Sequence, residues 1–172
     1  MDLYLDTGVF LGLDDKDTHY EAVEGFLTKH PLKENRFYSA NAVKEELNTK
    51  RREFTRRGWS KAERRRIFQI IEIFVSQNAV TFTHYDNCES KHPNFDSLYV
   101  DFFPIVEKDR FDATILANAF IWSCEVCGLK KPTVVTTDNG HFYKPKKELC
   151  QIANKHLNKN IFLNIQCVWD NF

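Results

Sequence analysis

The 172-residue sequence has little of what marks membrane-spanning, exported or disordered chains. It contains only six glycines and five prolines, too few for a turn-rich or low-complexity protein. No apolar run approaches the ~20 residues that cross a bilayer, and the N-terminus lacks the basic and then apolar segments of an export signal. The five cysteines are an odd number, which does not suit a disulfide framework. We therefore expect a cytoplasmic protein with reduced thiols and no membrane contact.

The sequence also lacks a net charge, because 24 basic residues balance 24 acidic ones. The distribution of these charges is uneven. Residues 50–66 hold nine Lys or Arg against two Glu, whereas residues 84–112 are predominantly acidic. A basic segment beside an acidic pocket suits a protein that binds a polyanion and manages it with a metal ion.

The apolar pattern predicts one α/β domain over residues 1–172, with a basic helical segment at about 50–77 and an irregular insertion at about 84–104. Short strands are predicted at 2–6, 36–39, 79–83, 132–137 and 161–167. Helices are predicted from near 17 to 30, after Asn41 as a cap, from a capping box at Ser60, over 109–127 and over 147–156. This alternation indicates βαβ units and a mostly parallel central sheet of about five strands, covered by helices on both faces.

The predicted helix over 109–127 combines a wide apolar face with two carboxylates in its first turn. Phe111, Ile115 and Ala119 recur at helical spacing, so this helix should be buried against the sheet. Asp109 and Asp112 are three residues apart and share one side of it. The helix dipole favours an anion here by roughly 0.3–1 kcal/mol, which accounts comfortably for one acid. A second acid indicates a shared cation site.

Further acids are predicted at the same place from distant segments. Asp6 stands at the carboxyl end of the first strand, and Asp138 follows the fourth. Sites in open α/β sheets form beyond the carboxyl ends of the strands. Either Glu45 or Glu46, in the first turns of a helix, can point toward that edge. Four acids are therefore expected to converge on one pocket.

These segments resemble the PIN-domain proteins, metal-dependent ribonucleases that include many toxins of toxin–antitoxin pairs. The resemblance rests on four pieces that occur in the family's order and span nearly the whole chain: 5–10 (LDTGVF), 39–47, 112–117 (DATILA) and 136–142 (TTDNGHF). It implies a three-layer fold, an acidic pocket that holds Mg²⁺ or Mn²⁺, and RNA as the substrate. An antitoxin or other protein, and a second copy of the chain, are the implied protein partners.

The resemblance also implies roles for individual residues. The catalytic residues would be Asp6, Glu46, Asp112 and Asp138, of which Asp6, Asp112 and Asp138 would ligate the metal. Auxiliary roles fall to Glu45, Asp109 and Thr136. Glu46 is preferred over Glu45 because the family's acid precedes an apolar residue, here Leu47, although the spacing from Ser39 accepts either glutamate.

Phosphodiester hydrolysis explains why such a site needs carboxylates. Mg²⁺ prefers hard oxygen ligands, and a bound ion can orient the phosphate and lower the pKa of a water molecule. Without metal the carboxylates repel one another, so at least one pKa should rise. Metal binding removes this penalty and should stabilise the fold.

The basic segment is predicted to contact RNA, with Phe54 and Trp59 available to stack on bases. It could equally be a solvated face or a docking surface for an acidic protein. The arginines assigned to RNA binding are Arg51, Arg52, Arg56, Arg57, Arg64 and Arg65.

Two further motifs are predicted to have structural roles only. Cys124 and Cys127 form a CxxC at a helix end, where zinc would need two more ligands, so buried inert thiols are favoured. His141 is interpreted as a packing or capping residue beside the pocket. The leading function is a metal-dependent endoribonuclease, and the alternative is a non-catalytic PIN-fold module that binds RNA or protein.

Overall fold

The central element is a five-stranded sheet in which all the strands are parallel. A computed structural model of the chain describes residues 1–31, 33–125, 132–158 and 163–171. The strands lie in the order β3-β2-β1-β4-β5. Their bounds are β1 Asp2–Leu5, β2 Arg36–Ala40, β3 Thr81–Thr83, β4 Thr133–Thr136 and β5 Asn164–Cys167. The predicted α/β fold with a parallel sheet is therefore confirmed.

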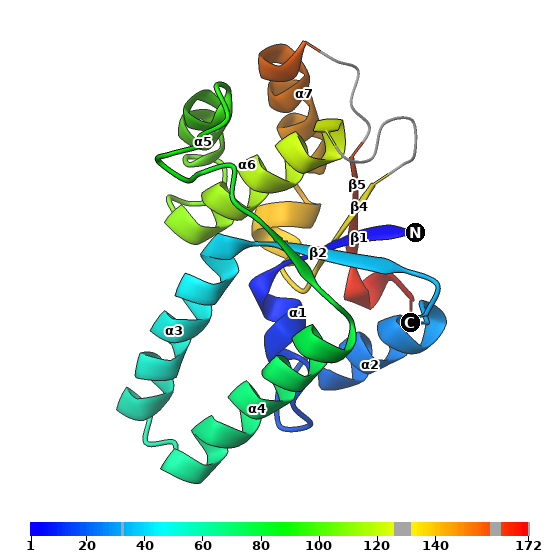
Figure 1. The fold of residues 1–172 in the computed structure, drawn as a ribbon, viewed down its shortest axis with the longest axis vertical. Helices are drawn as coiled ribbons and strands as arrows, with labels where there is room; N and C mark the ends of the chain where they lie inside the picture. Colours follow the sequence, from blue (N-terminus) through cyan, green and yellow to red (C-terminus); the bar gives the residue numbers. More distant parts are fainter. Residues whose placement is uncertain (32, 126–131, 159–162, 172) are drawn as a thin grey trace.

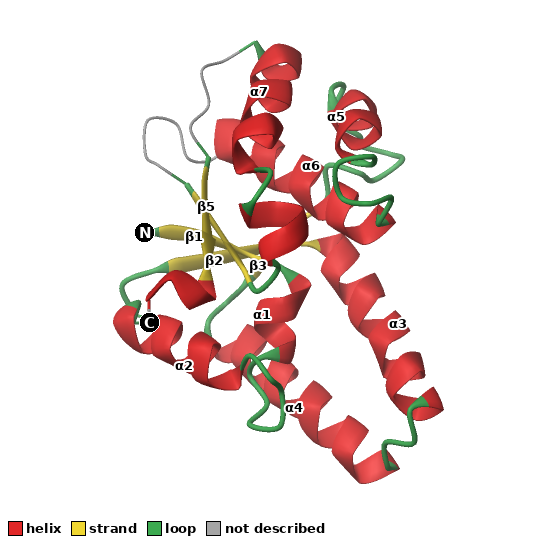
Figure 2. Cartoon of the chain, turned by 180° about the vertical axis from the view of Figure 1, so that it is seen from behind, coloured by secondary structure: helices red, strands yellow, loops and turns green. Residues whose placement is uncertain are grey.

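Helices cover both faces of this sheet (Figures 1 and 2). Helices α5, α6 and α7 lie on one face, and α1, α2 and α4 lie on the other. The α-helices are α1 Thr7–Leu11, α2 Tyr20–Lys29, α3 Asn41–Arg56, α4 Lys61–Gln77, α5 Phe95–Phe102, α6 Arg110–Glu125 and α7 Lys146–Leu157. A π-helical turn, η1 (Asn139–Tyr143), follows β4, and a 3₁₀ turn, η2 (Val168–Asn171), follows β5.

The core forms where the central strands meet α6. All four residues of β1 and of β4 are buried, as expected for parallel strands covered on both faces. Ten residues of α6 are buried, so the prediction of a helix buried against the sheet is confirmed. The ring of Trp122 lies 5.0 Å from those of Tyr4 and Tyr38, which joins α6 to β1 and β2. This packing fixes the start of α6 relative to the ends of the strands.

The basic segment forms an arm that extends away from the sheet in Figure 1. Helix α3 leaves the end of β2, and α4 returns toward the body. The predicted capping box is present, because the Ser60 side chain and Glu63 satisfy each other's backbone N–H groups. The stacked rings of Phe54 and Trp59, 4.5 Å apart, close the turn between the helices.

Several sequence predictions differ from the structure. Asn41 does not cap α3: it is the first helical residue, and Ala40 stands at the cap without a side-chain bond. The region 84–104 is not wholly irregular, because it contains α5, whose buried Phe95, Leu98 and Phe102 pack on α6 and α7. The helix is only eight residues long, so its period is hard to recognise without the partner helices. The CxxC residue Cys127 and the expected cap Gly128 lie outside the described residues.

Candidate active site

A pocket of about 260 Å³ lies beyond the carboxyl ends of β1 and β4. The starts of α1 and α6, one side of α3 and the turn after β4 form its walls. Its lining includes six carboxylates, from Asp6, Asp17, Glu46, Asp109, Asp112 and Asp138. The structure thus brings together acids that are up to 132 positions apart in the sequence (138 − 6).

Asp6 is held rigidly at the floor of this pocket. It caps α1 by accepting a 3.0 Å hydrogen bond from the backbone N–H of Val9, and the Thr136 hydroxyl donates to its other oxygen. Its side chain is almost fully buried. Burial raises the pKa of Asp6 to about 7, despite the two hydrogen bonds, which lower it. Burial therefore disfavours the charged form of this carboxylate when no cation is bound.

The two adjacent glutamates of α3 point to different places, because consecutive helical residues are about 100° apart. Glu46 enters the pocket and accepts a 2.5 Å hydrogen bond from the Thr7 hydroxyl. Burial raises the pKa of Glu46. Glu45 is exposed and lines a separate pocket with Asp86 and Arg110. The structure therefore places Glu46, and not Glu45, with the other acids.

The start of α6 supplies two carboxylates with different local duties. Asp109 accepts hydrogen bonds from the backbone N–H groups of Phe111, at 2.8 Å, and Asp112, at 3.2 Å, so it caps the helix as well as lining the pocket. Asp112 projects into the pocket. Burial raises the pKa of Asp112 to about 7, and repulsion from Asp109 and the other pocket acids adds to the rise.

Thr136 connects the two strand ends. Its hydroxyl donates to Asp6 and accepts a 2.8 Å hydrogen bond from the backbone N–H of Asp138. Asp138 in turn caps the π-helical turn by accepting from the backbone N–H of His141 at 2.8 Å. The buried threonine thus sets the spacing between the acids that follow β1 and β4.

The sequence analysis gave no role in the pocket chemistry to His141, and the structure places it among the acids. Its Nδ1 lies 2.6 Å from Asp112 Oδ2 and 3.4 Å from Asp138 Oδ2. Burial alone would lower the pKa of His141, but the hydrogen bond to Asp112 and the charges around it raise it overall. The position of His141, three residues after Asp138, was the sequence feature from which its place in the pocket could have been predicted.

Thr7 and Lys50 were also missed. The Thr7 hydroxyl orients Glu46, and Lys50 places a basic side chain in the pocket lining. Helical spacing provided a signal for the lysine, because Lys50 is four residues after Glu46 and shares its face of α3.

The six arginines predicted to bind RNA lie on the arm rather than in the pocket. None of them is among the described residues that line the acidic pocket. Arg51 lies over the ring of Phe68, and Arg64 donates to the Thr55 hydroxyl. These two side chains therefore also have contacts within the arm.

The donor set suits a divalent cation. One ligand atom each from Asp112, Asp138 and His141 lie within 4.8 Å of one another, and Asp6 and Glu46 line the same pocket. Carboxylate oxygens suit Mg²⁺ and Mn²⁺, and an imidazole nitrogen suits first-row transition metals. Burial is the main cause of the raised pKa values of Asp6 and Asp112, and repulsion from neighbouring acids adds to both.

The chain has a PIN-like fold, a parallel α/β sheet with an acidic pocket beyond its central strands, as the sequence resemblance predicted. The structure is similar to a chain of VapBC2 from Rickettsia felis, in a crystal structure of that complex bound to a DNA fragment from their promoter. The TM-score is 0.57 at 17% identity, and the match covers 97% of this chain and 98% of the other. No protein-family model matches the sequence, and no curated protein does. Among the described residues, no helix is both long enough and apolar enough to cross a membrane.

Proposed function

We propose that this protein is a metal-dependent endoribonuclease that hydrolyses RNA phosphodiester bonds. The observation that supports this most strongly is the group of carboxylates in one pocket, two of them with pKa values raised to about 7. The whole-length likeness to a chain of VapBC2 supports the same proposal.

In this proposal, some side chains of the pocket bind the cation and another activates the water. Asp6, Asp112 and Asp138 would hold Mg²⁺ or Mn²⁺, which neutralises phosphate charge and lowers the pKa of a bound water when present. Glu46 lies at the side of the pocket with its orientation set by Thr7. Burial raises the pKa of Glu46, which makes its carboxylate a stronger base toward the attacking water. Lys50 would attract the phosphate.

An antitoxin is the proposed protein partner, because the similar chain belongs to VapBC2, which was crystallised on promoter DNA. RNA is the proposed substrate. The arginines of the α3–α4 arm are proposed to contact its backbone, since the arm adds a local positive charge beside an acidic pocket.

Cleavage of labelled RNA tests the catalytic proposal. The wild-type protein should cut RNA with Mn²⁺ and stop when EDTA is added. Asp6→Asn and Asp112→Asn should each lower the rate by at least about 100-fold, since each removes a charge worth several kcal/mol to the metal-assisted reaction. Glu63→Gln, which alters a half-exposed acid of α4 outside the pocket, should retain the wild-type rate. RNA binding without metal-dependent cleavage would favour the non-catalytic module instead.

Charge reversal tests the arm. Arg64→Glu combined with Arg65→Glu should weaken RNA binding and lower the slope of log affinity against log salt by about 2, or one for each lost phosphate contact. The matched control reverses two exposed lysines of α7, Lys147 and Lys155. An unchanged slope in the arm variant would reject the arm as the RNA track.

A further inference from the structure

We infer that His141 is a direct nitrogen ligand of the cation in the acidic pocket, and that it makes the site select Mn²⁺ over Mg²⁺. This inference rests on the proposed metal-dependent function and narrows its choice of ion. The observations that carry it are the position of the ring between Asp112 and Asp138 and the carboxylate beside its other nitrogen.

The local backbone directs this ring into the pocket. The turn after β4 is π-helical rather than α-helical, a form that occurs mostly as single turns and often at functional sites. Asp138 caps the turn through the backbone N–H of His141, so the two side chains share one short loop. His141 Nδ1 then lies 2.6 Å from Asp112 Oδ2 and 3.4 Å from Asp138 Oδ2. A cation shared by the two carboxylates would therefore meet this nitrogen.

The second ring nitrogen faces a further carboxylate. His141 Nε2 lies 3.7 Å from Glu107 Oε2. Glu107 and its neighbour Lys108 both have positive φ angles, 52° and 67°, which residues with a Cβ rarely adopt. Histidines that ligate metals usually donate their other N–H to a carboxylate or carbonyl group, which fixes the tautomer. Glu107 lies just beyond hydrogen-bond distance of Nε2, so a small movement of its exposed side chain would form this bond while Nδ1 faces the cation.

A simple structural His–Asp hydrogen bond is the competing interpretation, and the chain contains one for comparison. His156 Nε2 lies 2.7 Å from Asp101 Oδ2, between α7 and α5, and its side chain is exposed to a similar extent. The group of described residues that could share a metal contains His141 and two acids, but not His156. His156 is therefore a matched control for a histidine with a carboxylate partner and no proposed ion.

Metal preference follows from the ligand type. Mg²⁺ favours oxygen ligands and water, whereas imidazole suits transition metals, and affinity at nitrogen sites rises along the first-row series from Mn²⁺. Replacing His141 with Asn should lower Mn²⁺ affinity by at least about tenfold and change Mg²⁺ affinity little. The ratio of the two affinities should therefore fall toward that of an all-oxygen site.

Electron paramagnetic resonance of Mn²⁺ added to the apoprotein tests the inference without measuring activity. Pulsed spectra of the wild type should show hyperfine coupling to one imidazole nitrogen. The coupling should vanish in His141→Asn and persist in His156→Asn and in His19→Asn, the latter because His19 also lines the pocket. Glu107→Gln should keep the coupling with weaker Mn²⁺ binding, which provides a second measurement if His141→Asn does not fold.

The outcomes separate this inference from the proposed function. Bound Mn²⁺ without nitrogen coupling, or coupling that is lost in His19→Asn and kept in His141→Asn, would overturn the role of His141 and leave the metal-dependent nuclease standing. Absence of Mn²⁺ binding to the wild type would overturn the inference, and absence of both Mn²⁺ and Mg²⁺ binding would overturn the proposed function as well.

Discussion

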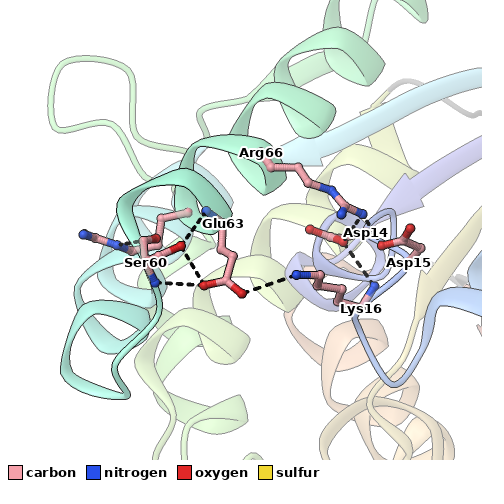
Figure 3. A network of polar contacts seen from close by, with 7 residues as sticks. Asp14, Asp15, Lys16, Ser60, Glu63 and Arg66 are labelled. Atoms are coloured by element: carbon pink, nitrogen blue, oxygen red, sulfur yellow. Dashed lines mark hydrogen bonds and ion pairs between the residues drawn. The ribbon is translucent and has the colours of Figure 1, made fainter.

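Two groups of carboxylates lie near opposite ends of α1 and behave in opposite ways. The first is the acidic pocket at the start of α1. The second follows α1 and joins it to α4 in a network of ion pairs (Figure 3). Burial raises the pKa of Asp6 and Asp112 in the pocket to about 7. In the network, hydrogen bonds lower the pKa of Glu63 to about 2, chiefly from Ser60, and that of Asp15, chiefly from Arg66.

In this network the carboxylates are paired with basic side chains of the same protein. Arg66 lies 3.0 Å from the buried Asp14 and also contacts Asp15, and Lys16 lies 3.3 Å from Glu63. Figure 3 shows these pairs linking the loop after α1 to the first two turns of α4. These acids therefore have a structural role: their ion pairs hold α4, and with it the arm, against the body of the protein.

The pocket has no such balance among its described side chains. Six carboxylates share a lining to which Lys50 and two histidines contribute the basic groups. In this chain, the number of acids in a group is therefore a weaker sign of function than the absence of basic side chains paired with them. Acids that are left uncompensated cost stability in the apoprotein, and a bound divalent cation would remove that cost.

The largest expected difference concerns Asp6. Its folded-state pKa of about 7 lies above the ordinary 3.8, so the folded apoprotein binds more protons than the unfolded chain between about pH 4 and pH 7. Stability should therefore fall as pH rises through this window. Asp6→Asn, which can still accept the Val9 N–H, should stabilise the metal-free protein at pH 8 by about 2 kcal/mol. It should also flatten the pH dependence, as measured by urea unfolding.

The control for this prediction is added Mn²⁺. The ion should stabilise the wild type more than Asp6→Asn, because the substitution removes the charge that the ion compensates. A variant that is less stable than the wild type at pH 8 without metal would show that Asp6 is a structural acid like those of the network.

Asp14 should respond in the opposite direction. Asp14→Ala should destabilise the protein by about 1–2 kcal/mol at pH 7, because it removes a buried acceptor from Arg66 and from the Lys16 backbone N–H. RNA cleavage by the folded fraction should not change. Urea unfolding and a cleavage assay measure the two effects, and a stabilising substitution would erase the contrast between the two groups of acids.

The smallest effect is expected for the exposed pair between Lys16 and Glu63. Lys16→Met should change the free energy of unfolding by less than about 0.5 kcal/mol, because water and salt screen such a pair. Comparing the variant with the wild type at low and at 1 M salt checks this. A difference above 1 kcal/mol that persists at high salt would mean that the network stabilises the arm more than its exposure indicates.

Sequence reasoning was strongest where one residue follows a regular element. Asp6 follows a strand and Asp112 lies in the first turn of a buried helix, so both positions could be anticipated from patterning. Choosing between Glu45 and Glu46 required knowing which side of α3 faces the pocket. The sequence motif fits either residue and therefore does not define this. Helix α5 was missed because a short amphipathic helix becomes recognisable only against α6 and α7.

The contacts of Thr7, Thr136 and His141 could not be predicted in the same way. Each depends on a side chain from another segment: Thr7 meets Glu46, Thr136 meets Asp6, and His141 meets Asp112. Sequence spacing defines neighbours only along one helix or strand. The metal and RNA-binding roles of the named residues remain predictions for the experiments above.

The order of the strands along the chain, the parallel sheet and the segments that carry the acids could be read from the sequence, because they follow from local periodicity and chain connectivity. The folded structure was needed to show which glutamate enters the pocket, which acids have paired cations and where the His141 ring lies. These properties depend on distances of a few ångströms between distant segments, and those distances are set by the packing of α3 and α6 against the sheet.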